Sequence, residues 1–173
     1  MKIVAATLRD VPALVGLMTA SPLLRRYGVG VVSARRSLLE GLRGSDVLLV
    51  AVDAGQIIGM AWLITSRALD RSAYLRLLLV AEEQHSRGVG AALLEAAERR
   101  ARSRRCRHVV LLVTATNRRA RTFYEGHGYR RVGILPDFVR RGIREALYGK
   151  TLATSDAGRR SRASRGRARP SVR

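Results

Sequence analysis

The sequence lacks the cysteines that a disulfide-stabilised fold or a cysteine-rich metal site would need. Its only cysteine, Cys106, lies among arginines just before an apolar run, and an unpaired structural thiol is the commoner role for such a residue than a nucleophile. No stretch approaches the roughly 18 apolar residues of a membrane-spanning helix. The first residues, Met1–Val4, have the pattern of a strand and not of a signal peptide. We therefore expect a cytoplasmic protein without a membrane anchor.

Acidic residues are also scarce: 13 acids stand against 33 basic residues, which gives a formal net charge of +20. Part of this excess lies in residues 158–173, which contain seven arginines and no acid. Such a segment cannot bury enough apolar surface to fold. We therefore predict one folded domain over residues 1–152 and a disordered basic tail over 153–173. The tail could bind polyanions non-specifically, but it has no aromatic residues for base stacking, which favours a solvated tail.

The central stretch of the chain, Tyr74–Tyr129, has the pattern of a strand, a glycine-containing loop, a helix, a second strand and a second helix. Leu75–Val80 is an apolar run typical of a strand buried on both faces. A polar loop follows and leads to Gly88-Val89-Gly90-Ala91, where a helix begins. Glycines let the backbone approach a ligand closely, and the free N–H groups of a helix start attract phosphate oxygens. The pattern therefore predicts a phosphate-binding turn.

The two glycines alone are weak evidence, because a tight turn that only lets helix and strand pack is an equally good interpretation. A third glycine is missing, and no lysine followed by serine or threonine is present. The loop therefore matches neither the dinucleotide-binding fingerprint nor the Walker loop.

Two motifs in this stretch resemble the GNAT superfamily of N-acetyltransferases. Gln84-His85-Ser86-Arg87-Gly88-Val89-Gly90-Ala91 is similar to the acetyl-CoA loop of that family, although the family usually has Gln or Arg at the position of His85. Asn117-x-x-Ala120-x-x-Phe123-Tyr124-Glu125-x-x-Gly128-Tyr129 is similar to its helix-and-turn segment. The resemblance covers residues 1–152. It implies an α/β (α+β) fold with a mixed, mostly antiparallel, twisted sheet of about seven strands, flanked by four helices and splayed between its fourth and fifth strands.

The resemblance also implies the activity and the residues that carry it. The activity is transfer of an acetyl group from acetyl-CoA, bound as co-substrate without a metal, to a primary amine. A bulge in the central strand would free backbone N–H groups for the thioester and pantetheine, and by position it would fall on Leu78–Val80. Tyr124 matches the tyrosine that protonates the CoA thiolate, since its ordinary pKa near 10 is close to that of a thiol. The implied cofactor-binding residues are Leu78, Leu79, Val80, His85, Ser86, Arg87, Gly88, Val89, Gly90, Ala91, Asn117 and Arg121, with Arg118 as an alternative to Arg121 at the 3′-phosphate.

The acceptor side is less defined by the sequence. We predict helices after Asp10 and after a Ser33 cap, joined by a loop at Ser21–Gly30. In the family these helices and their link line the acceptor groove, which makes Arg25, Arg26 and Tyr27 candidates for contact with the acceptor, although exposed loop residues more often have no such role. The scarcity of acids argues mildly against cationic acceptors such as aminoglycosides. A small amine, an amino acid or a protein amino group stays open.

A general base is not identified by the sequence. The strand Tyr74–Val80 contains no acid, although many relatives have a glutamate on the central strands. Three alternatives stay open: an acid that acts through a water, an amine that arrives neutral, or a histidine. The candidate acids are Asp70, Asp137 and Glu145, and the histidines are His108 and His127.

Two other functions are compatible with the same sequence. One is a non-catalytic sensor of acyl-CoA, which would keep the phosphate-binding turn but not depend on Tyr124. The other is a basic nucleic-acid- or ribosome-associated protein of the same fold. The sequence does not say whether the chain forms a homodimer.

Overall fold

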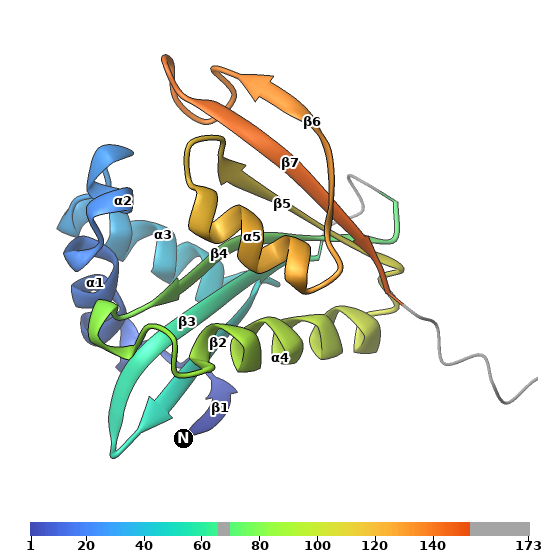
Figure 1. The fold of residues 1–173 in the computed structure, drawn as a ribbon. Coiled ribbons are helices and arrows are strands. Elements are labelled where there is room, and N and C mark those ends of the chain that lie inside the picture. The colour runs from blue at the N-terminus through green and yellow to red at the C-terminus, as the bar shows by residue number, and fades with distance from the viewer. Residues whose placement is uncertain (66–69, 153–173) are drawn as a thin grey trace, which may run out of the picture.

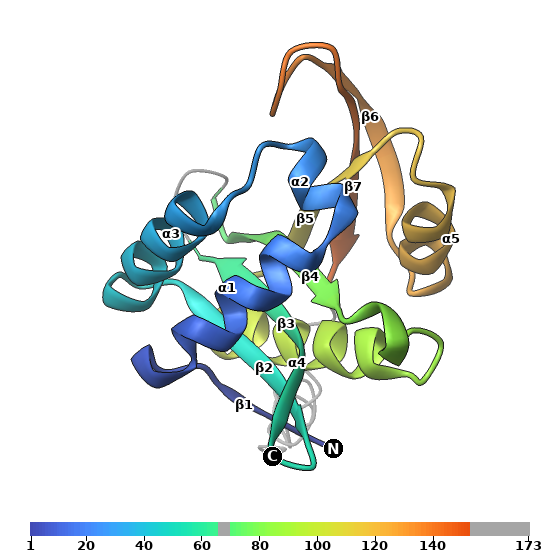
Figure 2. The ribbon, with the colours of Figure 1, turned by 90° about the vertical axis from the view of Figure 1, so that its left-hand side faces the viewer.

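The computed structural model describes residues 1–65 and 70–152, so the predicted tail of 153–173 lies outside the described residues. These residues form a seven-stranded sheet in the order β1-β2-β3-β4-β5-β7-β6, with helices on both faces (Figures 1 and 2). The strands are β1 (Lys2–Ala5), β2 (Val47–Asp53), β3 (Gln56–Ile64), β4 (Ser72–Val80), β5 (His108–Thr114), β6 (Arg130–Pro136) and β7 (Arg144–Thr151). The α-helices are α1 (Val11–Ala20), α2 (Pro22–Arg26), α3 (Val31–Arg43), α4 (Val89–Ser103) and α5 (Arg118–Gly126).

All neighbouring strands are antiparallel except β4 and β5, which are parallel. This arrangement confirms the predicted mixed, mostly antiparallel sheet. The pairing of β4 with β5 covers only Ser72–Leu75 and His108–Leu111, although both strands continue further. The two strands therefore separate beyond Leu75 and Leu111, and Figure 1 shows β5 and β7 diverging from β4. The gap between them is where the fold can admit a ligand.

A β-bulge lies in the central strand, but not at the predicted position. Leu75 pairs with Leu63 and Leu77 pairs with Trp62, so Arg76 is the extra residue between two consecutive pairs. The prediction of a bulge at Leu78–Val80 was therefore wrong. Arg76 is the only charged residue of this apolar strand, and its exposed guanidinium lies over the Trp62 ring, 4.7 Å from the centroid. Beyond the bulge, the side of β4 that faces β5 has no strand partner.

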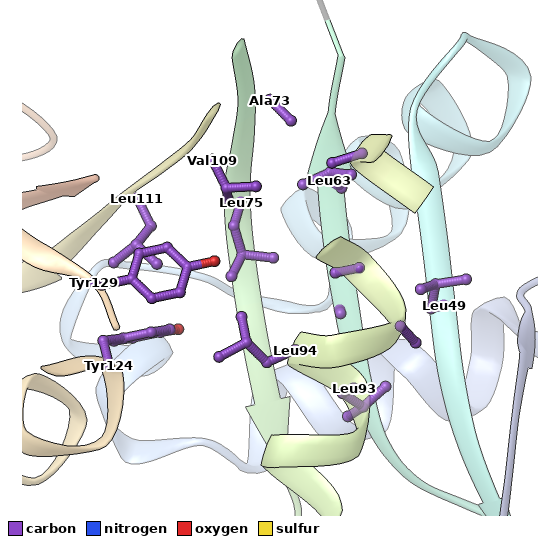
Figure 3. Packing of buried hydrophobic residues seen from close by; sticks show 14 of the residues in the cluster. Leu49, Leu63, Ala73, Leu75, Leu93, Leu94, Val109, Leu111, Tyr124 and Tyr129 are labelled. Atoms are coloured by element: carbon purple, nitrogen blue, oxygen red, sulfur yellow. The ribbon is translucent and has the colours of Figure 1, made fainter. Parts of the chain in front are cut away.

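The helices divide into two layers. α1 and α3 pack on one face through a buried cluster that includes Leu14, Leu38 and Trp62, while α4 packs on the other face through Leu93 and Leu94. Figure 2 shows α1 and α3 in front of the strands and α4 behind them. Figure 3 shows the second cluster, in which Tyr124 and Tyr129 lie on the β5 side, with their hydroxyl groups pointing toward β4.

Two local predictions on the acceptor side need correction. The segment predicted as a loop at Ser21–Gly30 contains the short helix α2, because Pro22 fits the first helical position and the Ser21 hydroxyl accepts a hydrogen bond from the Leu24 N–H (3.4 Å). α3 begins at Val31, with Gly30 and not Ser33 as its N-cap; the Ser33 hydroxyl accepts a hydrogen bond from the Gly30 N–H (3.0 Å).

Within the described residues, no helix has the length and apolar character needed to cross a bilayer.

Candidate active site

A cavity of about 1000 Å³ lies at the open end of β4, where it meets both helical layers. Five segments contribute to its lining: the α1–α2 hairpin, one residue of β3, the end of β4, the loop and first turn of α4, and the first turns of α5. The lining residues are Ala13, Gly16, Leu17, Ala20–Leu23, Ile57, Leu78–Ser86, Gly88–Ala91, Asn117, Arg119, Ala120, Phe123 and Tyr124. Most of the residues expected to bind the cofactor are among them, and Arg87 and Arg121 are not.

The start of α4 has the geometry of an anion-binding turn. Gly88 is the N-cap and has φ of +79°, a left-handed conformation that glycine adopts without strain. The first hydrogen bond of the helix runs from the Ala92 N–H to the Gly88 carbonyl (3.0 Å), and no side chain caps the N–H groups that precede it. The N–H groups of Val89, Gly90 and Ala91 are therefore free of helical partners at the cavity.

The loop before α4 is tied to the first turn of α5 by a histidine. His85 lies within hydrogen-bond distance of the Val80 carbonyl through Nε2 (3.1 Å) and of the Arg119 guanidinium through Nδ1 (3.2 Å). Because a guanidinium can only donate, Nδ1 is the acceptor and Nε2 carries the hydrogen that is donated to Val80. Arg119, which the sequence analysis did not select, thereby comes to the cavity as a fixed positive charge. Its only sequence signal is its place two residues after Asn117.

Small residues on α1 give the opposite wall of the cavity. Ala13, Gly16 and Ala20 recur at the spacing of one helix face, and Gly16 has no atom within 4 Å of the position that a Cβ would occupy. A ligand can therefore approach the helix backbone at Gly16. The spacing of these small residues is the sequence signal for this wall.

Tyr124 lies at the inner end of the cavity and is 8% exposed. Its ring packs edge-on against Phe123 and Tyr129, with centroids 5.2 and 5.5 Å away. The hydroxyl has no hydrogen-bond partner among the described residues, and none of their fully buried side-chain oxygens lacks one, so the hydroxyl keeps contact with the cavity. Burial raises the pKa of Tyr124 above its usual value, so the group is a weaker acid than the sequence argument assumed.

Three other residues expected to bind the cofactor form hydrogen bonds within the protein. The Asn117 side-chain oxygen accepts a hydrogen bond from the Ala120 N–H (3.0 Å) and caps α5, which leaves its amide NH₂ group for a ligand. Arg121 donates to the Tyr148 hydroxyl and to the Ala115 carbonyl, both at 3.2 Å. Arg87 donates to the Gln84 side chain (2.7 Å). The structure thus brings Arg119, and not Arg121, to the cavity.

A second polar cluster lies on the α2 side of the gap between β4 and β5. The Tyr27 hydroxyl, just after α2, donates to Glu145 Oε1 on β7 and lies 2.5 Å from the Thr114 hydroxyl on β5. Burial, and then the hydrogen bond to Glu145, raise the pKa of Tyr27 to about 12. The Arg140 guanidinium donates to the Arg26 carbonyl (2.9 Å) and connects the β6–β7 loop to the last residue of α2. Arg25 instead binds the carbonyls of Thr19 and Ala20, at 3.3 and 3.2 Å.

The matched family agrees with this arrangement of fold and cavity. Residues 25–152 match the family described as "Acetyltransferase (GNAT) domain". The chain belongs to the GNAT family of acetyltransferases. The general activity predicted from the sequence, that of a GNAT N-acetyltransferase, is thereby confirmed, and the identity of the acceptor is not. No curated protein sequence gives a match to this GNAT acetyltransferase.

Solved structures with the same fold include enzymes named for different acceptors. An aminoglycoside 6′-N-acetyltransferase complexed with coenzyme A has a TM-score of 0.76 and 19% identity, over 90% of this chain and 100% of that chain. The ribosomal-protein-alanine N-acetyltransferase of Brucella melitensis has a TM-score of 0.72 and 21% sequence identity, over 88% of this chain and 100% of that chain. The ribosomal-protein-S18-alanine N-acetyltransferase of Escherichia coli has a TM-score of 0.72 and 17% sequence identity, over 90% of this chain and 97% of that chain. At these low sequence identities, the structural similarity shows a shared fold and nothing about the acceptor.

Proposed function

We propose that this GNAT acetyltransferase transfers the acetyl group of acetyl-CoA directly to a primary amine in a ternary complex, with Tyr124 as the acid that protonates the CoA thiolate. The observation that carries the proposal is the continuous cavity between the first turn of α4 and the Tyr124 hydroxyl. A phosphate-binding helix start at one end and a proton donor at the other suit a long thioester substrate.

The residues around the cavity fit acetyl-CoA in three parts. The N–H groups of Val89, Gly90 and Ala91 would bind the pyrophosphate, with the Arg119 guanidinium as a fixed positive charge nearby. The unpaired side of β4 at Leu78–Val80 offers backbone groups to the pantetheine arm and the thioester carbonyl. The side-chain amide of Asn117 could bind the cofactor at the gap between the strands.

Tyr124 acts when the carbon–sulfur bond breaks. The amine nitrogen attacks the thioester carbon, the tetrahedral oxygen is stabilised by backbone N–H groups, and the thiolate leaves. Because burial raises its pKa, Tyr124 stays protonated at physiological pH and donates a hydrogen bond, and then the proton, to the sulfur. The amine loses a proton during the reaction, and solvent in the cavity carries that proton to the phenolate of Tyr124, which is thereby reprotonated.

The acceptor proposed here is a small amine, an amino acid or a protein amino group. The names of the structural neighbours favour no single one of these, since they include both an aminoglycoside and ribosomal proteins. Tyr27 is a candidate for contact with the acceptor, because its hydroxyl group donates a hydrogen bond to Glu145 beside the gap between β4 and β5.

Calorimetric titration with acetyl-CoA tests the cofactor. Wild-type protein should bind at tens of micromolar or tighter, and Gly16→Leu should weaken binding at least about tenfold, because its side chain enters open cavity space without a strained backbone. Gly126→Leu is the matched control: Gly126 also lies on a helix with nothing within 4 Å of its Cβ position, but outside the cavity lining. Absence of binding to the wild type, or equal binding to both variants, would contradict the proposal.

A further inference from the structure

Glu145 is a buried carboxylate with few partners. It is 2% exposed. Among residues 1–65 and 70–152, Tyr27 is the only residue that donates a hydrogen bond to its side chain, and no lysine, arginine or histidine lies within ion-pair distance. Burying an ionised carboxylate without a cationic partner is unfavourable by several kcal/mol, so such a group calls for a cation from elsewhere.

The second oxygen of this carboxylate accepts no hydrogen bond from the described residues. Only Oε1 receives the Tyr27 hydrogen bond. None of the fully buried side-chain oxygens in the described part of the chain lacks a partner, so Oε2 of Glu145 keeps contact with solvent. The carboxylate is therefore oriented by the protein on one oxygen and free to accept a hydrogen bond on the other.

The strand register places Glu145 on the acceptor side of the gap. Glu145 pairs with Thr114, and their neighbours Val113 and Ala146 pack into the cluster on the α4 side, so Thr114 and Glu145 face the opposite layer, toward α2. Thr114 lies three residues beyond Leu111, the last β5 residue that pairs with β4, and so it lies beside the gap. The charge of Glu145 also contributes to raising the pKa of Tyr74 on β4, after burial.

The helix α2 links the cavity to the cluster, although Tyr27, Thr114 and Glu145 do not themselves line the cavity. Pro22 and Leu23 line the cavity, and Tyr27 follows at the end of the same helix. The ionisable groups around Glu145 are the phenols of Tyr27 and Tyr74; the Arg26 charge acts on Tyr27 and the Arg76 charge on Tyr74. Within the described residues neither arginine forms an ion pair with Glu145, so its carboxylate lacks a cationic partner.

We propose that Glu145 binds the primary ammonium group of the acceptor and removes its proton, with Tyr27 and Thr114 as positioning residues. The inference rests on the proposed function and specifies the acceptor as a cationic primary amine. The ammonium transfers one proton to Glu145 Oε2, and its freed electron pair forms the bond to the thioester carbon while the carbon–sulfur bond breaks. The nitrogen then loses its second proton, the thiolate gains one, and Glu145 returns its proton to solvent.

The binding arm of the test uses n-butylammonium as the probe and coenzyme A-loaded protein, with saturation-transfer NMR as the readout. Wild type and Glu40→Gln, which removes an exposed carboxylate of α3, should give equal signals, whereas Glu145→Gln should lose at least about 90% of its signal. Uncharged n-butanol should give none. A signal that is absent from wild type, equal in Glu145→Gln, or shared by n-butanol would overturn the inference.

The catalytic arm measures thiol release from acetyl-CoA with n-butylamine at pH 7 and pH 9.5. Glu145→Gln should be about 100-fold slower than wild type at pH 7. It should recover to within about fivefold at pH 9.5, because about a tenth of an amine with an ordinary pKa near 10.4 is then neutral without a base, compared with less than about a thousandth at pH 7. Glu145→Asp keeps the charge and should retain most of the pH 7 rate. An equal defect at both pH values would indicate a structural role and overturn the inference.

Acetyl-CoA titration of the same samples separates the two proposals. Wild type that fails to bind acetyl-CoA contradicts the proposed function itself. A Glu145→Gln protein that binds both acetyl-CoA and n-butylammonium like wild type contradicts only the role of Glu145. If Glu145→Gln is too unstable to bind acetyl-CoA, the Glu145→Asp variant decides: loss of its n-butylammonium signal despite normal acetyl-CoA binding would overturn the inference, and retention would support it.

Discussion

Two glutamates are buried to nearly the same extent but differ in the number and charge of their hydrogen-bond donors. Glu98 on α4 is 5% exposed and Glu145 on β7 is 2% exposed. Glu98 accepts two hydrogen bonds from Lys150 Nζ (2.7 and 2.9 Å), one from the Tyr129 hydroxyl (3.2 Å) and one from Arg102 (3.3 Å). Glu145 accepts one, from a neutral phenol. Burial is therefore the same in the two sites, and only the partners differ.

The difference separates a structural site from a functional one. The Glu98 site is neutralised by Lys150 and connects α4, β7 and the turn after α5, which fixes the layer behind Tyr124. The Glu145 site has no cationic partner among the described residues and lies beside the gap between β4 and β5. A buried charge whose partners are all internal stabilises the fold, and one that lacks a partner points to a ligand.

The largest expected effect comes from breaking the satisfied site. Lys150→Met leaves the Glu98 carboxylate buried without its main cation, and we expect the free energy of unfolding to fall by about 3 kcal/mol. Lys2→Met, at an exposed position of β1, should change it by less than about 0.5 kcal/mol. Urea unfolding measures both. A Lys150→Met protein as stable as the Lys2→Met control would show that the Glu98 site does not stabilise the fold.

The second prediction compares the paired tyrosines of the core. Tyr124→Phe should slow thiol release about 100-fold with little change in stability, because its hydroxyl bonds to no described residue. Tyr129→Phe should do the reverse: it removes the hydrogen bond to Glu98, lowers the free energy of unfolding by about 1 kcal/mol, and leaves the rate unchanged. Steady-state kinetics and urea unfolding test both, and full activity of Tyr124→Phe would exclude its role as the acid.

The third prediction concerns alkaline pH at the Glu145 site. Burial and Glu145 raise the pKa of Tyr27 to about 12 from an ordinary value of 10, so the folded state holds this proton more tightly than the unfolded state. Its contribution to stability is complete below pH 10 and is lost as the pH rises toward about 12. Urea unfolding at pH 9 and pH 11 should therefore show a smaller loss for Tyr27→Phe than for wild type. Identical losses would mean that Tyr27 does not donate to Glu145 in solution.

The smallest effect is expected at Cys106, which neither glutamate site contacts. The thiol is buried, and burial raises its pKa, with Arg104 as a smaller opposing influence. At pH 8 the folded protein should react with iodoacetamide at least about tenfold more slowly than the urea-unfolded chain. Equal rates, measured by mass spectrometry, would show a reactive thiol and reopen the nucleophile interpretation.

The contiguous motifs were readable from the sequence. The apolar run before Gly88, the helical spacing after it and the segment from Asn117 to Tyr129 specify local structure, and the resemblance to the GNAT family implies the mixed sheet. The bulge was misplaced because its position depends on how β4 pairs with β3, which the run of leucines does not determine. The helix α2 was missed although Ser21-Pro22 is a helix start, because the segment was interpreted as a link.

The acceptor side could not be read in the same way, because its residues come together only in the fold. Tyr27 and Glu145 are 118 positions apart, and the His85–Arg119 contact spans 34. The sequence offered Glu145 as one of several acids. Its burial, its strand register and the identity of its one donor are what distinguish it from Asp137 and Asp70.

The most direct test of this account is urea unfolding of Glu98→Gln and Glu145→Gln beside wild type. We predict that Glu98→Gln loses about 2–3 kcal/mol, since Lys150 is left without its counter-ion, and that Glu145→Gln changes by less than about 1 kcal/mol, since it loses no ion pair. Equal losses, or a larger loss in Glu145→Gln, would contradict the division between a structural and a functional glutamate.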